Sequence, residues 1–188
     1  MDRDGTISQE KGYINHVARF ALYPGAAAAI RKLNDAEMLA VVITNQAGVA
    51  RGYFPFSLIP KVRDRMIELL QEEADAKVDG YYYCPHHKDG KVAPYNVPCN
   101  CRKPGTGLID QAAEELGIDV KKSYMIGDKI SDVYLAKAAG CKGILVLTGY
   151  GRGEKEYYSH TWKHQPDYIA ENLSEAIDWI LAQTEQHP

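Results

Sequence analysis

Residues 39–44 read Leu-Ala-Val-Val-Ile-Thr, a continuous apolar run that ends in a polar residue. A run of this length without alternating polar residues is typical of a strand buried on both faces of a sheet. Apolar residues at helical spacing flank it on both sides, over about 24–37 and 57–76. Because helices on both sides of a buried strand imply crossover connections, this stretch predicts a parallel sheet covered by helices.

Short apolar runs and helical segments continue to alternate along the rest of the chain. Strands are predicted at 79–84, 123–127, 143–148 and 167–170, and helices at 106–116, 130–139 and 173–183. The predicted fold class is therefore α/β, with an open, doubly wound parallel sheet. No repeat, long linker or insertion large enough for a separate cap domain occurs, so residues 1–188 are predicted to form one domain.

The composition is that of an ordinary globular protein. Hydrophobic residues make up 45% and charged residues 25% of 188, and 22 basic against 25 acidic residues give a formal charge of −3. This balance disfavours a broad electrostatic surface for nucleic acid. The apolar stretches are shorter than the ~20 residues of a membrane helix, and no secretory signal is present. We expect a cytoplasmic monomer that binds neither nucleic acid nor a membrane.

Polar residues stand where the predicted strands end, the edge at which ligands collect in parallel sheets. The four stretches are Asp2-Arg3-Asp4-Gly5-Thr6, Thr44-Asn45-Gln46, Arg102-Lys103-Pro104, and Gly127-Asp128-Lys129 followed by Asp132. Each alone has an ordinary explanation, such as a solvated turn for the first or a helix cap for Asp128. The pattern that the four stretches form together is far more specific than any one of them.

In this order on an α/β frame, the four motifs resemble the haloacid dehalogenase superfamily of phosphotransferases, and the resemblance spans essentially the whole chain. It implies that Asp2 attacks phosphorus and forms an aspartyl-phosphate, with Asp4 as general acid and base. It also implies that Thr44 and Lys103 hold the transferring phosphoryl group. Mg²⁺ is expected at Asp2, Asp128 and the backbone carbonyl of Asp4, with Asp132 orienting Lys103.

Three of the four cysteines gather in a stretch, about 84–103, that lacks regular apolar patterning. Cys84-x-His86, twelve residues and then Cys99-x-Cys101 suit a closed tetrahedral Cys₃His site for a structural Zn²⁺. We choose His86 over His87 partly from the family pattern. Cysteines without metal are the alternative, and Cys141 is predicted to be a core residue.

The zinc loop narrows the resemblance to the branch that contains histidinol-phosphate phosphatases and heptose bisphosphate phosphatases. Gly12-Tyr13, the stretch 44–52 and Tyr82-Tyr83-Cys84-Pro85-His86-His87 favour the heptose side. The resemblance then implies hydrolysis of the 7-phosphate of a heptose bisphosphate, a small phosphosugar, with Arg102 on the remaining phosphate. The implied substrate-binding residues are Glu10, Lys11, Gly12, Tyr13, Thr44, Asn45, Gln46, Arg102, Lys103 and Lys129. Histidinol phosphate, or another small phosphomonoester, remains the alternative substrate.

One feature departs from the family. In this superfamily the nucleophile ends a buried apolar strand, whereas only Met1 precedes Asp2 here. We expect Met1 to be an internal methionine of a protein that starts upstream; the alternative is a short form with a gap between two halves of the sheet. A zinc-binding nucleic-acid module and an inactive truncated pseudo-enzyme are the alternatives of another class.

Overall fold

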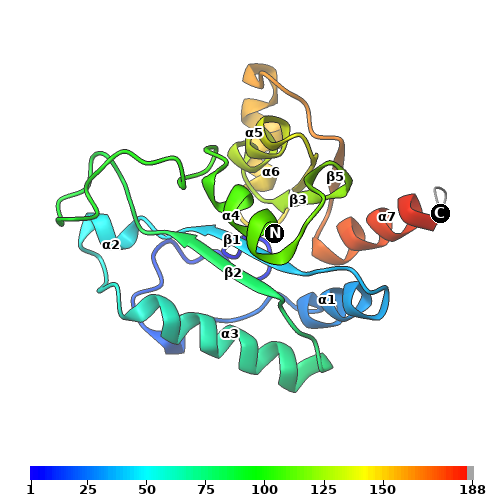
Figure 1. Cartoon of the computed structure of the whole chain (residues 1–188), viewed down its shortest axis with the longest axis horizontal. Coiled ribbons are helices and arrows are strands. Elements are labelled where there is room, and N and C mark those ends of the chain that lie inside the picture. Colours follow the sequence, from blue (N-terminus) through cyan, green and yellow to red (C-terminus); the bar gives the residue numbers. More distant parts are fainter. Residues whose placement is uncertain (186–188) are drawn as a thin grey trace.

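The computed structural model describes residues 1–185, which form a layered α/β arrangement (Figure 1). Its helices and strands are α1 (Ala26–Asp35), β1 (Val41–Asn45), α2 (Gly48–Arg51), α3 (Leu58–Ala74), β2 (Gly80–Cys84), α4 (Gly107–Leu116), β3 (Tyr124–Gly127), α5 (Ile130–Ala139), β4 (Lys142–Val146), α6 (Gly151–Gly153), β5 (Tyr168–Ala170) and α7 (Leu173–Glu185). Single turns of 3-10 helix lie at Val17–Arg19, Val120–Lys122 and Ser159–Thr161, and a π-helical turn at Glu154–Tyr158.

The predicted α/β class is confirmed, and every predicted strand and helix occurs with its bounds within two residues of the expected ones. The short helices α2 and α6 and the turns that follow α6 were not predicted. They span three to five residues each, too few to show a hydrophobic period in the sequence. Among residues 1–185, no helix is long and apolar enough to cross a membrane.

All the strand pairs are parallel, but they form two separate sheets. In one, β1 pairs with β2 from Val41 opposite Gly80 to Asn45 opposite Cys84. In the other, β4 lies between β3 and β5. Because the strands run in the same direction, their carboxyl ends lie at one edge of the structure, where the polar motifs follow them.

Helices cover both faces of the sheets, so that there are two apolar cores. The first core holds the buried residues of α1, α3 and α7, and the second holds those of α4 and part of α5. Successive strand residues alternate between them: Val42 and Ile126 lie in the first, Ile43 and Met125 in the second. This two-sided burial explains why residues 39–44 read as an unbroken apolar run.

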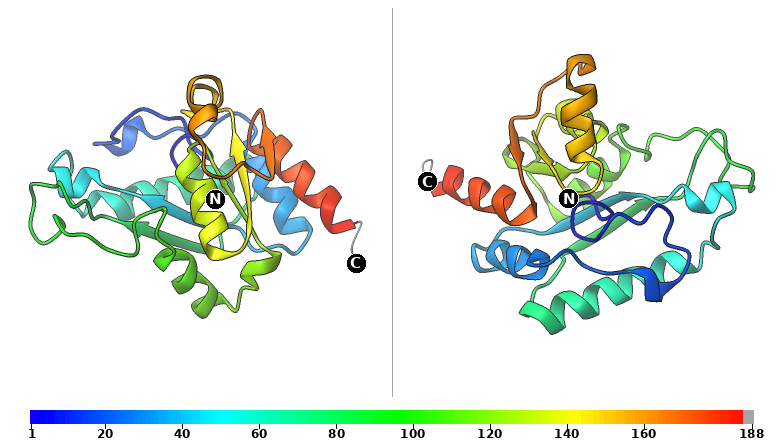
Figure 2. Two further views of the ribbon diagram at one scale, coloured as in Figure 1. Left: turned by 90° about the horizontal axis from the view of Figure 1, so that it is seen from above. Right: turned by 180° about the vertical axis from the view of Figure 1, so that it is seen from behind.

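The first helix and the last helix of the chain pack together in the first core. Helices α1 and α7 lie side by side (Figure 2). The Lys32 ammonium lies 2.5 Å from the Asp178 carboxylate across their exposed side. Below this ion pair, Ile30 and Leu33 of α1 and Ile177 and Ile180 of α7 are buried in one cluster. The C-terminal helix therefore completes the core on which β3 and β4 rest.

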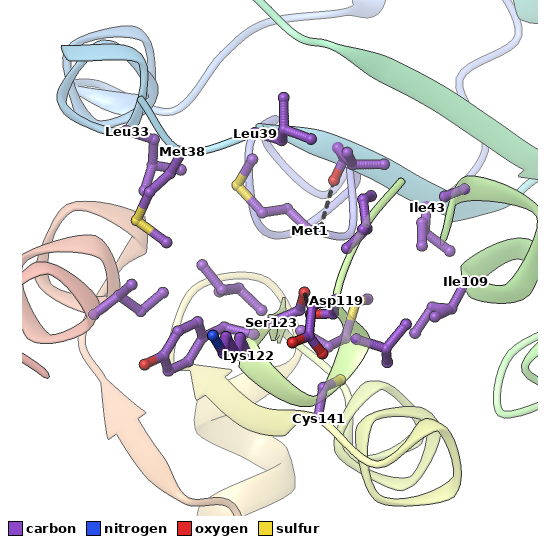
Figure 3. Close-up of a pocket in the computed structure, with 18 of the residues that line it drawn as sticks. Met1, Leu33, Met38, Leu39, Ile43, Ile109, Asp119, Lys122, Ser123 and Cys141 are labelled. Atoms are coloured by element: carbon purple, nitrogen blue, oxygen red, sulfur yellow. Dashed lines mark hydrogen bonds between the residues drawn. The ribbon is translucent and has the colours of Figure 1, made fainter. Parts of the chain in front are cut away.

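An apolar groove of about 340 Å³ separates β1 from β3 (Figure 3). Its walls come from both sheets and from the segments that lead into them, and they include Leu39 and Val41 on one side and Tyr124 and Ile126 on the other. Cys141, predicted to be a core residue, is buried and also contributes to the wall. The groove lies between the two sheets, and Met1 is part of its lining.

Met1 and Asp2 lie between the two sheets and bond to both. The Met1 amino group donates to the carbonyl of Val41 at 2.7 Å, and the Ile43 N–H donates to the carbonyl of Met1 at 2.8 Å. On the other side, the Asp2 N–H donates to the carbonyl of Ile126 at 2.8 Å. These are the bonds of a strand parallel to β1 and β3. The Met1 amino group is buried, and this burial lowers its pKa to about 6.

We predict that a chain extended ahead of Met1 by about five apolar residues, the usual length of a strand, will be more stable than the present chain. The added residues would continue both ladders through the groove and exclude water from its apolar walls. Each kcal/mol added to the free energy of unfolding raises the melting temperature of a domain of this size by roughly 2–4 °C. Several ladder hydrogen bonds, at about 1 kcal/mol each, therefore predict a rise near 10 °C.

A matched extension of Gly and Ser residues is the control, since it has the same length but no apolar side chains. Thermal unfolding followed by circular dichroism would make the comparison. Equal melting temperatures for the two extended chains would show that the groove does not accept a strand.

Candidate active site

A buried lysine holds two carboxylates together at the carboxyl ends of the strands. The Lys103 ammonium lies 2.9 Å from Asp2 Oδ1 and 2.6 Å from Asp132 Oδ1, and all three residues are less than 7% exposed. Burial alone would lower the pKa of Lys103, but Asp132 and Asp2 outweigh it and raise the pKa above its usual value. Lys103 therefore carries a permanent positive charge beside Asp2.

The backbone of Lys103 is held by a side chain at the end of β1. Asn45, the last residue of β1, accepts the Lys103 N–H on its Oδ1 at 3.1 Å, and its Nδ2 donates to the Lys103 carbonyl at 3.3 Å. A paired amide of this kind satisfies both backbone groups of one residue. Asn45 thus positions Lys103 in the site.

A third carboxylate, that of Asp128, completes a cluster in which oxygens of Asp2, Asp128 and Asp132 all lie within 4.8 Å of one another. Asp128 follows β3 and is fully buried; its Oδ2 accepts the Tyr150 N–H at 2.9 Å, while its Oδ1 has no partner. Burial and the nearby Asp2 raise the pKa of Asp128 to about 8. Three buried carboxylates against one ammonium fit a hard divalent cation.

A glycine makes this arrangement possible. Gly5 has a φ of +86°, and a Cβ atom there would overlap with the Asp128 carboxylate. The turn after Asp4 can therefore pass directly over the cluster only without a side chain.

Asp4 faces a different set of partners. Arg3, which is almost wholly buried, donates from Nε and Nη2 to the two oxygens of Asp4 at 2.9 and 2.6 Å, and from Nη1 to the Tyr81 hydroxyl at 2.9 Å. Burial would raise the pKa of Asp4, but Arg3 and the hydrogen bonds from Gln46 and Ser8 lower it. Asp4 is thus held as a carboxylate.

Gln46 links Asp4 to Thr44, which begins the polar motif at the end of β1. Its Nε2 donates to Asp4 Oδ2 at 3.0 Å and to Thr44 Oγ1 at 2.9 Å. Thr44 is buried, and the Gln46 amide joins its hydroxyl to the Asp4 carboxylate.

These residues open into a pocket of about 340 Å³. All the sequence-predicted catalytic and substrate-binding residues line it, apart from Lys11. Lys11 is exposed outside the pocket, and its carbonyl accepts a hydrogen bond from Arg19. The contact of Lys11 with substrate stays a prediction. Lining residues that the sequence did not single out are Ile14, Phe54, Ser131 and Tyr150.

The cysteine loop forms a second cluster next to this pocket. Ligand atoms of Cys84, His86, Cys99 and Cys101 lie within 4.8 Å of one another, and His86 Nδ1 is 3.3 Å from Cys101 Sγ. All the cysteines are free, so the three sulfurs, 3.1–3.5 Å apart, are not bridged. Four soft donors at such separations suit a tetrahedral metal ion.

His87, the neighbouring imidazole, lies outside that cluster. Its Nε2 is 2.9 Å from Arg51 Nη2, at the end of α2. Desolvation together with Arg102 and Arg51 lowers the pKa of His87. Arg102 itself lines the pocket and lies between the last cysteine and Lys103 in the chain.

The chain matches a family model described as HAD-hydrolase-like over residues 100–176. It is 43% identical over 184 residues to the D-glycero-D-manno-heptose-1,7-bisphosphate 7-phosphatase of Thermosynechococcus vestitus, covering 96% of this chain and 93% of that protein. It is 41% identical over 183 residues to the D-glycero-beta-D-manno-heptose-1,7-bisphosphate 7-phosphatase of Escherichia coli K12, covering 96% and 86%.

Solved structures of phosphatases are also similar to this chain. A D,D-heptose 1,7-bisphosphate phosphatase from B. bronchiseptica, complexed with magnesium and phosphate, superposes with a TM-score of 0.83 at 29% identity, covering 97% of this chain and 96% of that one. A putative HAD-like phosphatase from Mesorhizobium loti superposes with a TM-score of 0.81 at 35% identity, covering 98% and 84%. The chain belongs to the haloacid dehalogenase-like phosphatases. The curated relatives described above are heptose bisphosphate phosphatases.

The carboxylate cluster predicts that Mg²⁺ will stabilise the folded protein. At pH 8 the folded state must keep Asp128 charged against its raised pKa, and a bound cation would relieve this repulsion. Binding at 100 times the dissociation constant is worth about 2.7 kcal/mol, which is roughly 5–10 °C in melting temperature for a domain of this size.

Asp128→Asn is the matched variant, because it keeps the side-chain volume and removes the charge. We expect it to be at least as stable as the parent without Mg²⁺ and to gain little when Mg²⁺ is added. Differential scanning calorimetry with and without Mg²⁺ measures both effects, and an equal Mg²⁺ response in the two proteins would contradict the placement of the cation at Asp128.

Proposed function

We propose that this protein hydrolyses the 7-phosphate of D-glycero-D-manno-heptose 1,7-bisphosphate through an aspartyl-phosphate on Asp2. The observation that carries the proposal is the buried Asp2 carboxylate, held by Lys103 at the floor of a pocket lined with polar residues. Relatives that carry this activity in their names align over nearly the whole chain and support the choice of substrate.

In the first step an oxygen of Asp2 attacks phosphorus, and the bond between phosphorus and the sugar oxygen breaks. The leaving oxygen takes a proton from Asp4, so that it departs as a hydroxyl group. Lys103 and the Thr44 hydroxyl hold the phosphoryl oxygens in line with Asp2. The second step reverses the roles: Asp4 takes a proton from water, the water oxygen attacks phosphorus, and Asp2 is released with inorganic phosphate.

Asp2, Asp128 and the backbone carbonyl of Asp4 would hold Mg²⁺, which supplies positive charge to the phosphoryl oxygens when bound. Asp132 has another task, because its Oδ1 is occupied by Lys103 and its Oδ2 by the Lys129 N–H at 3.2 Å. It keeps Lys103 pointing at Asp2.

The sugar and its second phosphate would occupy the outer part of the pocket. Glu10, Gly12 and Tyr13 form one wall, and Arg102 and Lys129 supply positive charge there. A guanidinium suits a phosphate because it can donate two parallel hydrogen bonds. The pocket lies within one domain and would act on a small phosphosugar.

Zn²⁺ in the Cys84, His86, Cys99 and Cys101 cluster would be structural. Four protein ligands close a tetrahedral site, leaving no position for substrate or water. Its effect on the reaction would pass along the chain, because Arg102 and Lys103 directly follow Cys101.

The substrate is tested by comparing release of inorganic phosphate from heptose bisphosphate and from histidinol phosphate. We expect kcat/KM to be at least about 100-fold higher for the heptose, since a second phosphate adds charged contacts of about 1.5–3 kcal/mol each.

Asp2→Asn is the control for the mechanism: it keeps the volume of the nucleophile and should leave less than about 1% of the turnover, since a covalent step is lost. Preference for histidinol phosphate would overturn the substrate assignment, and an active Asp2→Asn protein would overturn the mechanism.

The zinc assignment is tested by Cys101→Ser. We expect about one zinc per chain in the parent and much less in the variant, because one of four ligands is weakened. KM should rise and kcat should fall, through the displacement of Arg102 and Lys103, while the Mg²⁺ concentration for half-maximal activity stays near that of the parent. Cys141→Ser is the matched control, because Cys141 lies outside the cluster. A parent protein that holds no zinc when purified without chelator would contradict the assignment.

A further inference from the structure

The loop after β4 is fixed against the carboxylate cluster. The Thr148 hydroxyl donates to the carbonyl of Gly5 at 2.6 Å, and the Tyr150 N–H donates to Asp128 Oδ2 at 2.9 Å. Between them, Gly149 has a φ of +55°, and a Cβ atom there would overlap with the Asp128 carboxylate. The backbone of Tyr150 is therefore held at a defined position, and its side chain emerges at the pocket wall.

The ring of Tyr150 lies against the ammonium of Lys129. The Lys129 Nζ is 4.3 Å from the ring centroid, well inside the distance at which a cation is attracted to an aromatic face. Both residues line the same pocket. Tyr150 is half exposed, so its ring is not needed to fill either apolar core.

Besides this ring, Lys129 has one carboxylate within 4 Å among the described residues, while the buried Asp128 and Asp2 attract it from farther away. Glu10 Oε2 is 3.7 Å from its Nζ, and the Lys129 side chain is 39% exposed. A lysine with a long stem and one distant partner has many accessible rotamers. An aromatic ring restricts them without cancelling the charge, whereas a second carboxylate would neutralise it. The arrangement therefore presents a positive charge to an incoming anion.

We propose that Tyr150 is a positioning residue that holds the Lys129 ammonium toward a phosphate group of the substrate. The proposal rests on the phosphatase function proposed above and adds a residue to its binding site. Tyr150 acts on binding rather than on phosphoryl transfer, because in the proposed reaction the transferring group is held by a separate lysine, Lys103, which pairs with Asp2.

Tyr150→Leu tests this role, since it removes the ring and keeps both an apolar side chain and the backbone N–H that bonds to Asp128. We expect KM for heptose bisphosphate to rise about three- to fivefold, the equivalent of a cation–π contact at a partly exposed site, with kcat within about twofold. Tyr150→Phe keeps the ring and should match the parent. A fall in kcat with a changed Mg²⁺ requirement would instead show that the loop supports Asp128, and would overturn the proposal.

The same substitution in a Lys129→Met background separates positioning from any direct contact of the ring. If Tyr150 acts through Lys129, Tyr150→Leu will have no further effect once the ammonium is gone. An equal loss in both backgrounds would overturn the proposal. Tyr150→Met serves as a second ring-free variant should the leucine protein be unstable.

Calorimetric titration with inorganic phosphate at saturating Mg²⁺ makes the test independent of the sugar. We expect weaker phosphate binding by Tyr150→Leu than by the parent, and no such difference in the Lys129→Met background. If the parent failed to hydrolyse heptose bisphosphate but showed this coupling, the proposed substrate would be wrong and the role of Tyr150 would stand. If it hydrolysed the heptose but showed no coupling, the role of Tyr150 would be wrong.

Discussion

The site depends on one buried ammonium group between two carboxylates. Asp2 lies between the two sheets, Asp132 is in the first turn of α5, and Lys103 comes from the loop before α4, so the three segments converge only at this point. Without Lys103, the two carboxylates would face each other and Asp128 in a site that excludes water. Removing one partner of a buried ion pair commonly costs 3–5 kcal/mol, because the remaining charge is left without compensation.

The cysteine cluster lies close to Lys103 along the chain. The segment between β2 and α4 has no regular structure, and such a segment has many conformations unless something restrains it. Cys84 lies at the end of β2 and Cys101 two residues before Lys103, so a metal held by both would tie the far end of this loop to the sheet. Asn45 then fixes the backbone of Lys103 itself. The last cysteine of the cluster and the lysine of the carboxylate site are thus two positions apart in the chain.

The sequence predicted the parts of the site that follow from strand order. Thr44, Lys103 and Asp128 each lie in or beside a recognisable element, and parallel strands bring their carboxyl ends together. Two contacts could not be predicted in this way: that of Tyr150 with Asp128 and that of Arg3 with Tyr81. Each joins two residues that lie far apart in the chain and carry no local pattern. Lys11 is exposed outside the pocket, although its neighbours Glu10 and Gly12 line it, so its contact with substrate stays a prediction.

The surroundings of Asp4 affect both roles that the proposed reaction gives it, those of general acid and general base. With Arg3 on both of its oxygens and its pKa lowered, Asp4 is kept in the carboxylate form that the second step requires. Donating a proton in the first step requires that some of this stabilisation be lost. Gln46 offers a route, because its Nε2 is shared between Asp4 and Thr44. A phosphoryl group that engages the Thr44 hydroxyl brings negative charge next to this amide and to Asp4. That charge raises the pKa of Asp4, so the bound substrate itself favours the acid form, and donation of the proton to the leaving oxygen then leaves Asp4 as the carboxylate base for the second step.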